Sequence, residues 1–448
     1  MSFDPVALRS QLKHDLHHRL RPMVGRDPAE RGRSVTPLEL LYDLVYVVAF
    51  AAAADELAHH VSEGHVVAAL TGYAFAVFAL SWAWMNFTWF SSAYNNDDAL
   101  FRIVTATQMI GAVVFTVGLA DGFEDAVHGH IPQSDIMLIG YVIMRLPLVA
   151  LWLRAAREDD ERRHIAIGYA STIAAAQVLW ILLAVLPLPV GLTAVGLVVL
   201  AISEMVAPVI LERRLGRAPW NAGHVAERFH LLTLITLGEV VAATAAAVTA
   251  LAQTDGWSLA AVTIVSSGLV LTGALWWAYS LIPSRTILEE WPDRVWLWRY
   301  AHLPIFGSIA AVGAGLRIAS TAVHEEHLSV FDVAVSLAIP VGAVLLTVFL
   351  TWSVLMRAYD LSHVPLFLST LVPLALALII GALLGVDQPL DLSDRASLVA
   401  LVSVIVLVAL SAVIEVVGHE LVGFSHTVRV LEADTNGLDP ARSTSLSE

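Results

Sequence analysis

Long apolar stretches separated by short polar segments run through almost the whole chain. Twelve of them have the roughly 20 residues that an α-helix needs to cross the ~30 Å hydrocarbon core of a bilayer. Most are uniformly apolar and do not alternate, which disfavours a barrel of membrane-spanning strands. The pattern predicts an all-α integral membrane protein with twelve transmembrane helices. They cover about 37–58, 66–90, 100–120, 135–153, 165–187, 190–211, 226–251, 257–282, 297–319, 330–356, 364–385 and 396–418.

The composition fits this pattern. Of 448 residues, 57% are hydrophobic and only 15% are charged, whereas soluble domains carry about 25% charged residues. We therefore expect the lipid bilayer to be the main partner. The net charge of −15 argues against nucleic acid, and the absence of cysteine excludes disulfides and thiolate metal sites. The 13 tryptophans cluster near the predicted helix ends, where membrane proteins carry aromatic belts.

Basic residues predict the orientation of the helices. With twelve spans, 22 of the 25 basic residues lie on the side of the two termini. The other side holds only Arg317 and Arg395, and Arg145 lies inside a helix. Because basic residues favour the cytoplasmic side, we expect a multi-pass protein of the bacterial inner membrane with both termini in the cytoplasm. Residues 1–35 form a basic tail without a signal peptide, either an amphipathic helix on the membrane or a solvated segment; residues 422–448 are expected to be disordered.

The two halves of the chain resemble each other in order. At nearly constant offsets, Arg102 matches Arg299 and Gly118 matches Gly315. These matches predict two six-helix repeats, 36–212 and 224–421, joined by a cytoplasmic linker at 213–223. Because six is even, the repeats would be parallel, related by an axis along the membrane normal.

A few ionisable residues fall inside the predicted helices, where each costs about 2.5–3.5 kcal/mol. At ~1.5 Å per residue, Asp43, Arg145, Glu204 and Glu239 lie within about 10 Å of one another in depth around the bilayer midplane. Glu415 lies nearer the surface. Arg145 is flanked by apolar residues and needs an anion, so we expect Glu204 or Glu239 beside it first and Asp43 second. A polar site and a purely structural buried pair both remain open.

Further candidates lie beside these residues or at helix ends. They are Glu39, Tyr42, Tyr46, Glu227, His230, Arg102 and Arg299. Tyr42 and Tyr46 are expected to form a hydrogen-bonded group with Asp43, whereas Glu39 fits a helix cap with Thr36.

Two polar segments have ordinary structural explanations. Asn95–Asp98 predicts a helix cap with an ion pair from Asp98 to Arg102. His324–His327 could hold a metal weakly, although a solvated loop is the commoner role.

Neither HExxH, GxSxG nor a P-loop occurs in the sequence, so we expect no enzyme, no cofactor and no metal centre. The charged residues at midplane depth favour a secondary transporter for an unknown small solute or ion. An ion channel lined by the first and seventh helices is the alternative, followed by a sensor or enzyme without transport.

Three segments carry a resemblance to a known family. They run from Glu39 to Val48, from Asn96 to Arg102 and from Glu227 to Glu239. Together they resemble the bacterial low-temperature-requirement A (LtrA) family. The resemblance implies a bacterial multi-pass inner-membrane protein and says little about mechanism.

Overall fold

The chain folds into a bundle of long helices. The computed structural model describes residues 20–255, 258–322, 328–356, 364–386 and 388–423. Within these ranges, twelve helical spans are long and apolar enough to cross a membrane. The predicted all-α, twelve-helix membrane architecture is therefore confirmed.

The first six spans contain seven helices, because the third is interrupted. They are α2 (Pro37–Ser62), α3 (Val66–Tyr94), α4 (Ala99–Val117) with α5 (Leu119–Val127), α6 (Asp135–Glu158), α7 (Arg163–Val185) and α8 (Val190–Leu215).

The second six spans include short extra turns. They are α9 (Ala222–Asp255), α10 (Leu259–Ser280) with α11 (Ser284–Glu290), a 3-10 turn (Pro292–Arg294) leading into α12 (Val295–Thr321), α13 (Val330–Leu355), α14 (Val364–Leu384) and α15 (Arg395–Gly418). A π-helical turn, His419–Gly423, follows α15.

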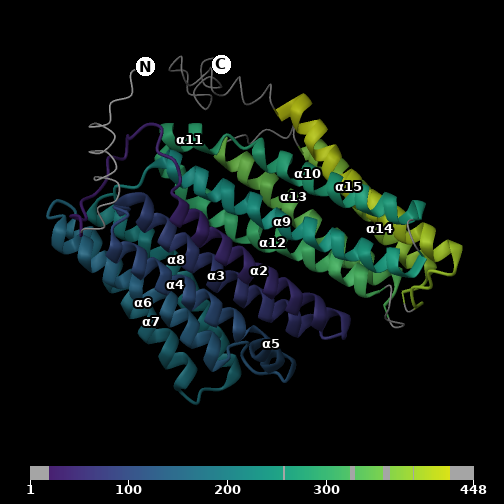
Figure 1. Cartoon of the computed structure of the whole chain (residues 1–448), viewed down its shortest axis with the longest axis horizontal. Helices are drawn as coiled ribbons and strands as arrows, with labels where there is room; N and C mark the ends of the chain where they lie inside the picture. The colour runs from purple at the N-terminus through teal and green to yellow at the C-terminus, as the bar shows by residue number, and fades with distance from the viewer. Residues whose placement is uncertain (1–19, 256–257, 323–327, 357–363, 387, 424–448) are drawn as a thin grey trace, which may run out of the picture.

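The two sets of helices lie side by side (Figure 1). Helices α2 and α3 of the first half pack against α9 and α12 of the second half. The start of α2 and the end of α15 lie toward the same end of the bundle (Figure 1), as an even number of spans requires. Helix α2 thus lies at the contact between the halves, and its side chains can interact with both.

Local sequence signals explain where several helices begin. Thr36 caps α2, and Glu39 reciprocates in a capping box with Pro37 at the first helical position. Asp98 caps α4 by accepting a hydrogen bond from the Phe101 N–H. Both predicted caps are confirmed. They supply acceptors for N–H groups that have no partner within the helix.

Glycines set the closest contact within the first half. A Cβ on Gly111 would lie 2.6 Å from the Met144 nitrogen, and a Cβ on Gly140 would overlap the backbone of Phe115. Helices α4 and α6 therefore approach more closely than larger residues permit. Such small-residue contacts are common where van der Waals packing, and not the hydrophobic effect, holds membrane helices together.

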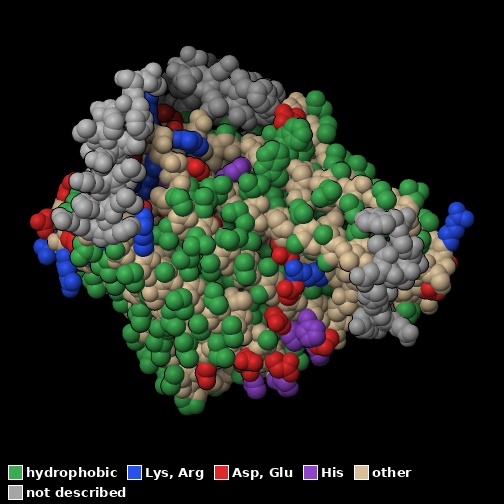
Figure 2. All heavy atoms as spheres, viewed as in Figure 1, with side chains coloured by type: hydrophobic (Ala, Val, Ile, Leu, Met, Phe, Trp, Pro, Cys, Tyr) green, Lys and Arg blue, Asp and Glu red, His purple; other side chains and the backbone are tan. Residues whose placement is uncertain are grey.

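Hydrophobic side chains cover broad areas of the molecular surface (Figure 2). Many are strongly exposed leucines, valines and isoleucines, such as Val67 and Leu383, each 80% exposed. Apolar surface of this extent is suited to lipid tails rather than water.

Residues 20–35 are packed onto the bundle, unlike the solvated tail proposed for this segment. The Gly25 N–H donates to Asp159 (3.0 Å), and the Arg33 guanidinium donates to the carbonyls of Ser91 (2.8 Å) and Ser92. The Asn221 side chain donates to the Pro28 carbonyl (2.9 Å). These bonds tie the segment to the end of the bundle where α3 and α6 finish. Residues 1–19 and 424–448 lie outside the described residues.

The glycine contact predicts the effect of one added methyl group. Gly140→Ala should separate α4 from α6 and destabilise the protein by about 1–3 kcal/mol, the usual cost of overpacking. Thermal melting in detergent measures the change. Gly273→Ala is the matched control, because nothing lies within 4 Å of a Cβ added there. Equal melting temperatures for the two variants would contradict this account of the packing.

Candidate functional site

The charged residues predicted at midplane depth do not gather into one group. They divide into three clusters, each built around its own arginine. Arg145 pairs with Glu204, Asp43 pairs with Arg228, and Glu239 pairs with Arg317. The structure therefore contains three separate ion pairs and not the single shared site that the sequence predicted. In each pair the arginine and the carboxylate come from different helices.

Glu204 on α8 is the carboxylate that neutralises Arg145 on α6. Arg145 Nη2 lies 2.5 Å from Glu204 Oε2, and both side chains are at most 3% exposed. The indole N–H groups of Trp82 and Trp180 each donate to Glu204 at 2.6 Å. The prediction that a carboxylate lies beside Arg145 is confirmed, and the partner is Glu204, one of the two expected first.

Several polar atoms around this pair remain without a hydrogen bond. In the described part of the chain, Arg145 Nε and Nη1 and the Tyr141 hydroxyl have no partner. The Arg145 guanidinium carbon lies 5.7 Å from the centre of the Tyr141 ring. A buried unpaired polar group costs about 1–3 kcal/mol. Arg145 and Tyr141 therefore have hydrogen-bonding groups that a bound molecule could satisfy.

Asp43 on α2 is bound by Arg228 on α9. The guanidinium donates twice, from Nη2 to Oδ1 (2.5 Å) and from Nε to Oδ2 (3.2 Å), and the Trp84 indole adds a bond of 2.6 Å. Arg228 Nη1 also lies 3.3 Å from Glu39 Oε1. Glu39 therefore acts both as part of the helix cap and as a partner of Arg228, and its other oxygen lies 3.4 Å from His224 Nε2.

The sequence alone did not single out Arg228, because at the start of a helix it counted as an ordinary cytoplasmic charge. The positions of Glu39 and Asp43 could have indicated that a buried cation lies nearby. They lie four residues apart on one face of α2, so both point the same way. Two carboxylates buried together need a cation. All three side chains are fully buried.

The third cluster lies at the Ser62 end of α2. Arg317 on α12 contacts both Asp55 on α2 and Glu239 on α9. Asp55 is 58% exposed and Arg317 is 23% exposed, so this cluster is less enclosed than the other two. It brings together the same two halves of the bundle as the Asp43–Arg228 pair.

Tyr42 and Tyr46 on α2 form a hydrogen-bonded pair. The hydroxyls of Tyr42 and Tyr46 are 2.9 Å apart. The Tyr42 hydroxyl also donates to Gln108 Oε1 on α4 (3.4 Å), and the Tyr46 hydroxyl to the Met144 sulfur on α6 (3.2 Å). The predicted tyrosine pair is therefore present, but Asp43 bonds to Trp84 and Arg228 instead of the tyrosine hydroxyls.

Arg299 on α12 lies in a cage of aromatic rings. Its guanidinium carbon lies 4.8–5.8 Å from the ring centres of Trp89, Trp82, Trp296 and Tyr300. Among the described residues, none of its guanidinium nitrogens has a hydrogen-bond partner. Glu212, which was not a candidate from the sequence, accepts hydrogen bonds from Trp89 of this cage (3.0 Å) and from Tyr169 (2.8 Å). Cation–π contacts worth about 0.5–2 kcal/mol each offset part of the cost of this burial.

The remaining candidates lie apart from the three clusters. Arg102 is 45% exposed and pairs with Asp97 (2.7 Å), so the predicted pair with Asp98 is wrong. Asp98 pairs with Arg154 instead (2.6 Å). Burial alone would raise the pKa of Asp98, but the bonds from Arg154 and the Phe101 N–H outweigh it and lower that pKa.

Two further candidates lie in the first three turns of α9. Glu227 is half-buried, and the centre of the His230 ring lies 5.5 Å from that of Tyr279.

Glu415 on α15 is buried, and its Oε2 has no hydrogen-bond partner within the described ranges. The segment His324–His327 lies outside the described residues.

Comparison with known proteins finds one family. The sequence model described as "Bacterial low temperature requirement A protein (LtrA)" matches residues 34–408. An uncharacterised protein of Rhizobium meliloti (strain 1021) is 26% identical over 319 residues, covering 66% of this chain and 72% of the relative. No solved structure matches significantly.

The Arg145–Glu204 pair predicts opposite results for a single and a double substitution. Arg145→Met strands a buried carboxylate and should cost about 3–5 kcal/mol of unfolding free energy. Arg145→Met combined with Glu204→Gln removes both charges and should recover most of that loss. Melting in detergent compares them, with Arg102→Met as the exposed control that should change little. A double variant as unstable as the single one would show that Glu204 is not what compensates Arg145.

Proposed function

The chain belongs to the bacterial low temperature requirement A (LtrA) family, and we propose that it is a secondary transporter in the bacterial plasma membrane. In this proposal both termini lie in the cytoplasm, and the two halves of the bundle move against each other around α2. The substrate is a small solute or ion. The proposal includes no enzymatic step and no cofactor.

The observation that carries the proposal is the pair of charge clusters along α2. The inner cluster consists of Glu39, Asp43 and Arg228, and the outer cluster of Asp55, Glu239 and Arg317. Asp43 and Asp55 are twelve residues apart, or about 18 Å along the helix. Each cluster joins α2 to the second half of the chain. Alternating access requires two such contacts, one on each side of the substrate, that open in turn.

Energetics favour a moving contact over a static one. Buried ion pairs contribute little net stability, because the loss of hydration offsets the attraction, and apolar residues often replace them without cost. Two charged clusters at one helix interface are therefore an inefficient way to hold it closed permanently. When an interface opens to water, by contrast, rehydration of the charges lowers the cost of separating them.

The Arg145–Glu204 pair is the proposed contact point for the substrate. It lies inside the first half, and the Tyr42–Tyr46 pair of α2 bonds to Met144, the residue before Arg145. The unused groups at this pair include the N–H donors of Arg145 and the hydroxyl of Tyr141. A solute that carries hydrogen-bond acceptors, such as a small organic anion, would satisfy them.

We also propose that the halves are parallel repeats. The matched glycines Gly118 and Gly315 occupy similar places. A Cβ on Gly118 would lie 2.6 Å from the Met137 nitrogen on α6, and one on Gly315 would overlap the Ser336 carbonyl on α13. The packing of α4 on α6 and of α6 on α7 recurs as α12 on α13 and α13 on α14.

A channel lined by α2 and α9 is the competing proposal. Arg228 and Asp43 face each other across these two helices without exposure. A conducting path between α2 and α9 would have to separate this pair permanently, whereas a carrier needs to separate it only once in each cycle. We therefore favour the carrier.

Orientation is tested with reporter fusions. Fusions after Ala126 and Glu326 should report the outside, and fusions after Arg157 and Arg217 should report the cytoplasm, because basic residues concentrate on that side. An alkaline phosphatase reporter read against a cytoplasmic fluorescent reporter gives the assignment. Opposite results at all four positions would invert the inner and outer clusters.

The two-contact mechanism predicts how accessibility changes when one cluster is weakened. The chain has no cysteine, so Ala54→Cys, at a fully buried position between Asp43 and Asp55, supplies a single label site. With Arg317→Gln added, a membrane-impermeant maleimide should label the introduced thiol faster from outside. With Arg228→Gln added instead, labelling should rise only from inside, because the inner cluster is then weakened.

Ala54→Cys without further change is the control for both labelling experiments. Reconstituted liposomes then show whether solute flux saturates and whether either cluster variant abolishes it. Unchanged labelling in both cluster variants would overturn the alternating-access proposal. Single-channel currents in the wild type would establish the channel instead.

A further inference from the structure

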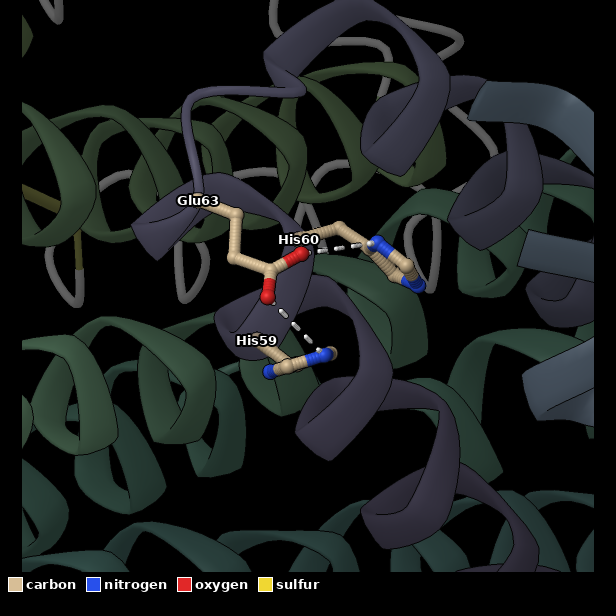
Figure 3. A group of neighbouring side chains, drawn as sticks. All are labelled: His59, His60 and Glu63. Carbon is tan, nitrogen blue, oxygen red and sulfur yellow. Dashed lines mark ion pairs between the residues drawn. The ribbon is translucent and has the colours of Figure 1, made fainter. Parts of the chain in front are cut away.

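Three potential metal ligands converge at the Ser62 end of α2 (Figure 3). One ligand atom each from His59, His60 and Glu63 lies within 4.8 Å of the others. His59 Nε2 is 3.6 Å from Glu63 Oε1, and His60 Nδ1 is 3.9 Å from Glu63 Oε2. Ligands of a tetrahedral ion with bonds of about 2.1 Å are roughly 3.4 Å apart. The two histidine–glutamate distances are close to that spacing.

His60 is oriented as a metal ligand would be. It is only 4% exposed, and its Nδ1, which points toward Glu63, has no hydrogen-bond partner among the described residues. Its ring stacks on Phe123 of α5, with centres 5.6 Å apart and planes inclined by 12°. Its other nitrogen, Nε2, faces Glu56 Oε2 at 3.7 Å. A carboxylate behind the far nitrogen is the usual way in which proteins orient a metal-binding histidine.

We propose that His59, His60 and Glu63 bind one divalent transition-metal ion of the Zn²⁺ class. Two imidazoles and a carboxylate suit Zn²⁺ or Co²⁺, whereas Mg²⁺ and Ca²⁺ prefer oxygen ligands alone. His59 is 61% exposed and Glu63 is 50% exposed, so an ion reaches the site from water. With three protein ligands, a fourth position stays open, and the ion is exchangeable.

The charge around the site favours a cation. Two carboxylates lie near the His60 ring, Glu56 at 3.7 Å and Glu63 at 3.9 Å. Glu124 of α5 and the histidines His59 and His65 also contribute to the electrostatic environment of His60. Histidine and acidic side chains also lie next to one another at the margin of the face in Figure 2. Carboxylates concentrated in this way raise the local concentration of cations. The site does not depend on the proposed transport function.

An ordinary surface pair is the alternative explanation, and the same region contains one for comparison. His128 lies 3.5 Å from Glu124, four residues earlier, and both are about 60% exposed. The described residues place no third ligand with this pair. His128→Ala is therefore the matched control for His60→Ala.

Metal binding by the purified full chain tests the proposal. The purification tag must contain no histidine. Titration with Co²⁺ should give saturable visible absorption typical of tetrahedral coordination, at one ion per chain, and Zn²⁺ should displace it. His60→Ala, His59→Ala and Glu63→Gln should abolish the signal. Glu56→Gln, which only orients His60, should weaken binding about 10–100-fold. Acidification should release the ion, because protonated imidazole cannot coordinate it.

Three controls make each outcome decisive. Melting without metal shows whether each variant is folded, and His59 and Glu63 are exposed enough that their variants should be. Saturating Zn²⁺ should raise the melting temperature of the wild type and of His128→Ala but not of Glu63→Gln, since a ligand stabilises only the state that binds it. A double variant, His324→Ala with His327→Ala, tests the other histidine-rich segment. No saturable binding, or binding lost in that double variant and kept in His60→Ala, would overturn the proposal.

Discussion

A guanidinium buried in a lipid-embedded bundle needs compensation, which is a carboxylate for three arginines here and a cage of aromatic rings for Arg299, and much of this structure follows from that requirement. Arg145, Arg228 and Arg317 each meet a carboxylate from another helix. Separating such a pair strands one charge at a cost of about 3–5 kcal/mol. Each pair therefore fixes which helices are neighbours. Arg228 and Arg317 also join the first half of the chain to the second, because they bind Asp43 and Asp55 of α2.

Tryptophan side chains also stabilise buried carboxylates, so that few basic residues are needed. The sequence suggested that tryptophans form belts at the membrane surface, yet Trp82, Trp84 and Trp89 are almost fully buried and donate their indole N–H groups to Glu204, Asp43 and Glu212. An indole fills apolar space and supplies one donor without adding charge. It can therefore stabilise a buried carboxylate where another arginine would require a further anion.

Helix α2 concentrates the candidate chemistry of the molecule. Asp43 and Asp55 link it to the second half at two depths, and His60 lies a little more than one turn beyond Asp55. A shift of α2 relative to α9 and α12 would therefore act on both charge clusters at once. In the proposed transporter, both contacts that have to open and close therefore lie on this one helix, where the two halves meet.

The sequence by itself determined the membrane environment, the number of spans and the need of Arg145 for an anion, because hydrophobic length and the cost of buried charge act locally along a chain. It also placed Thr36 and Asp98 at helix starts, since capping depends on neighbouring residues. Tertiary structure alone decided the partners. Arg228 became the centre of a cluster, and His60 was left with an unused nitrogen, because helices distant in sequence packed around them. No local pattern specifies such contacts, since they depend on how twelve similar apolar surfaces fit together.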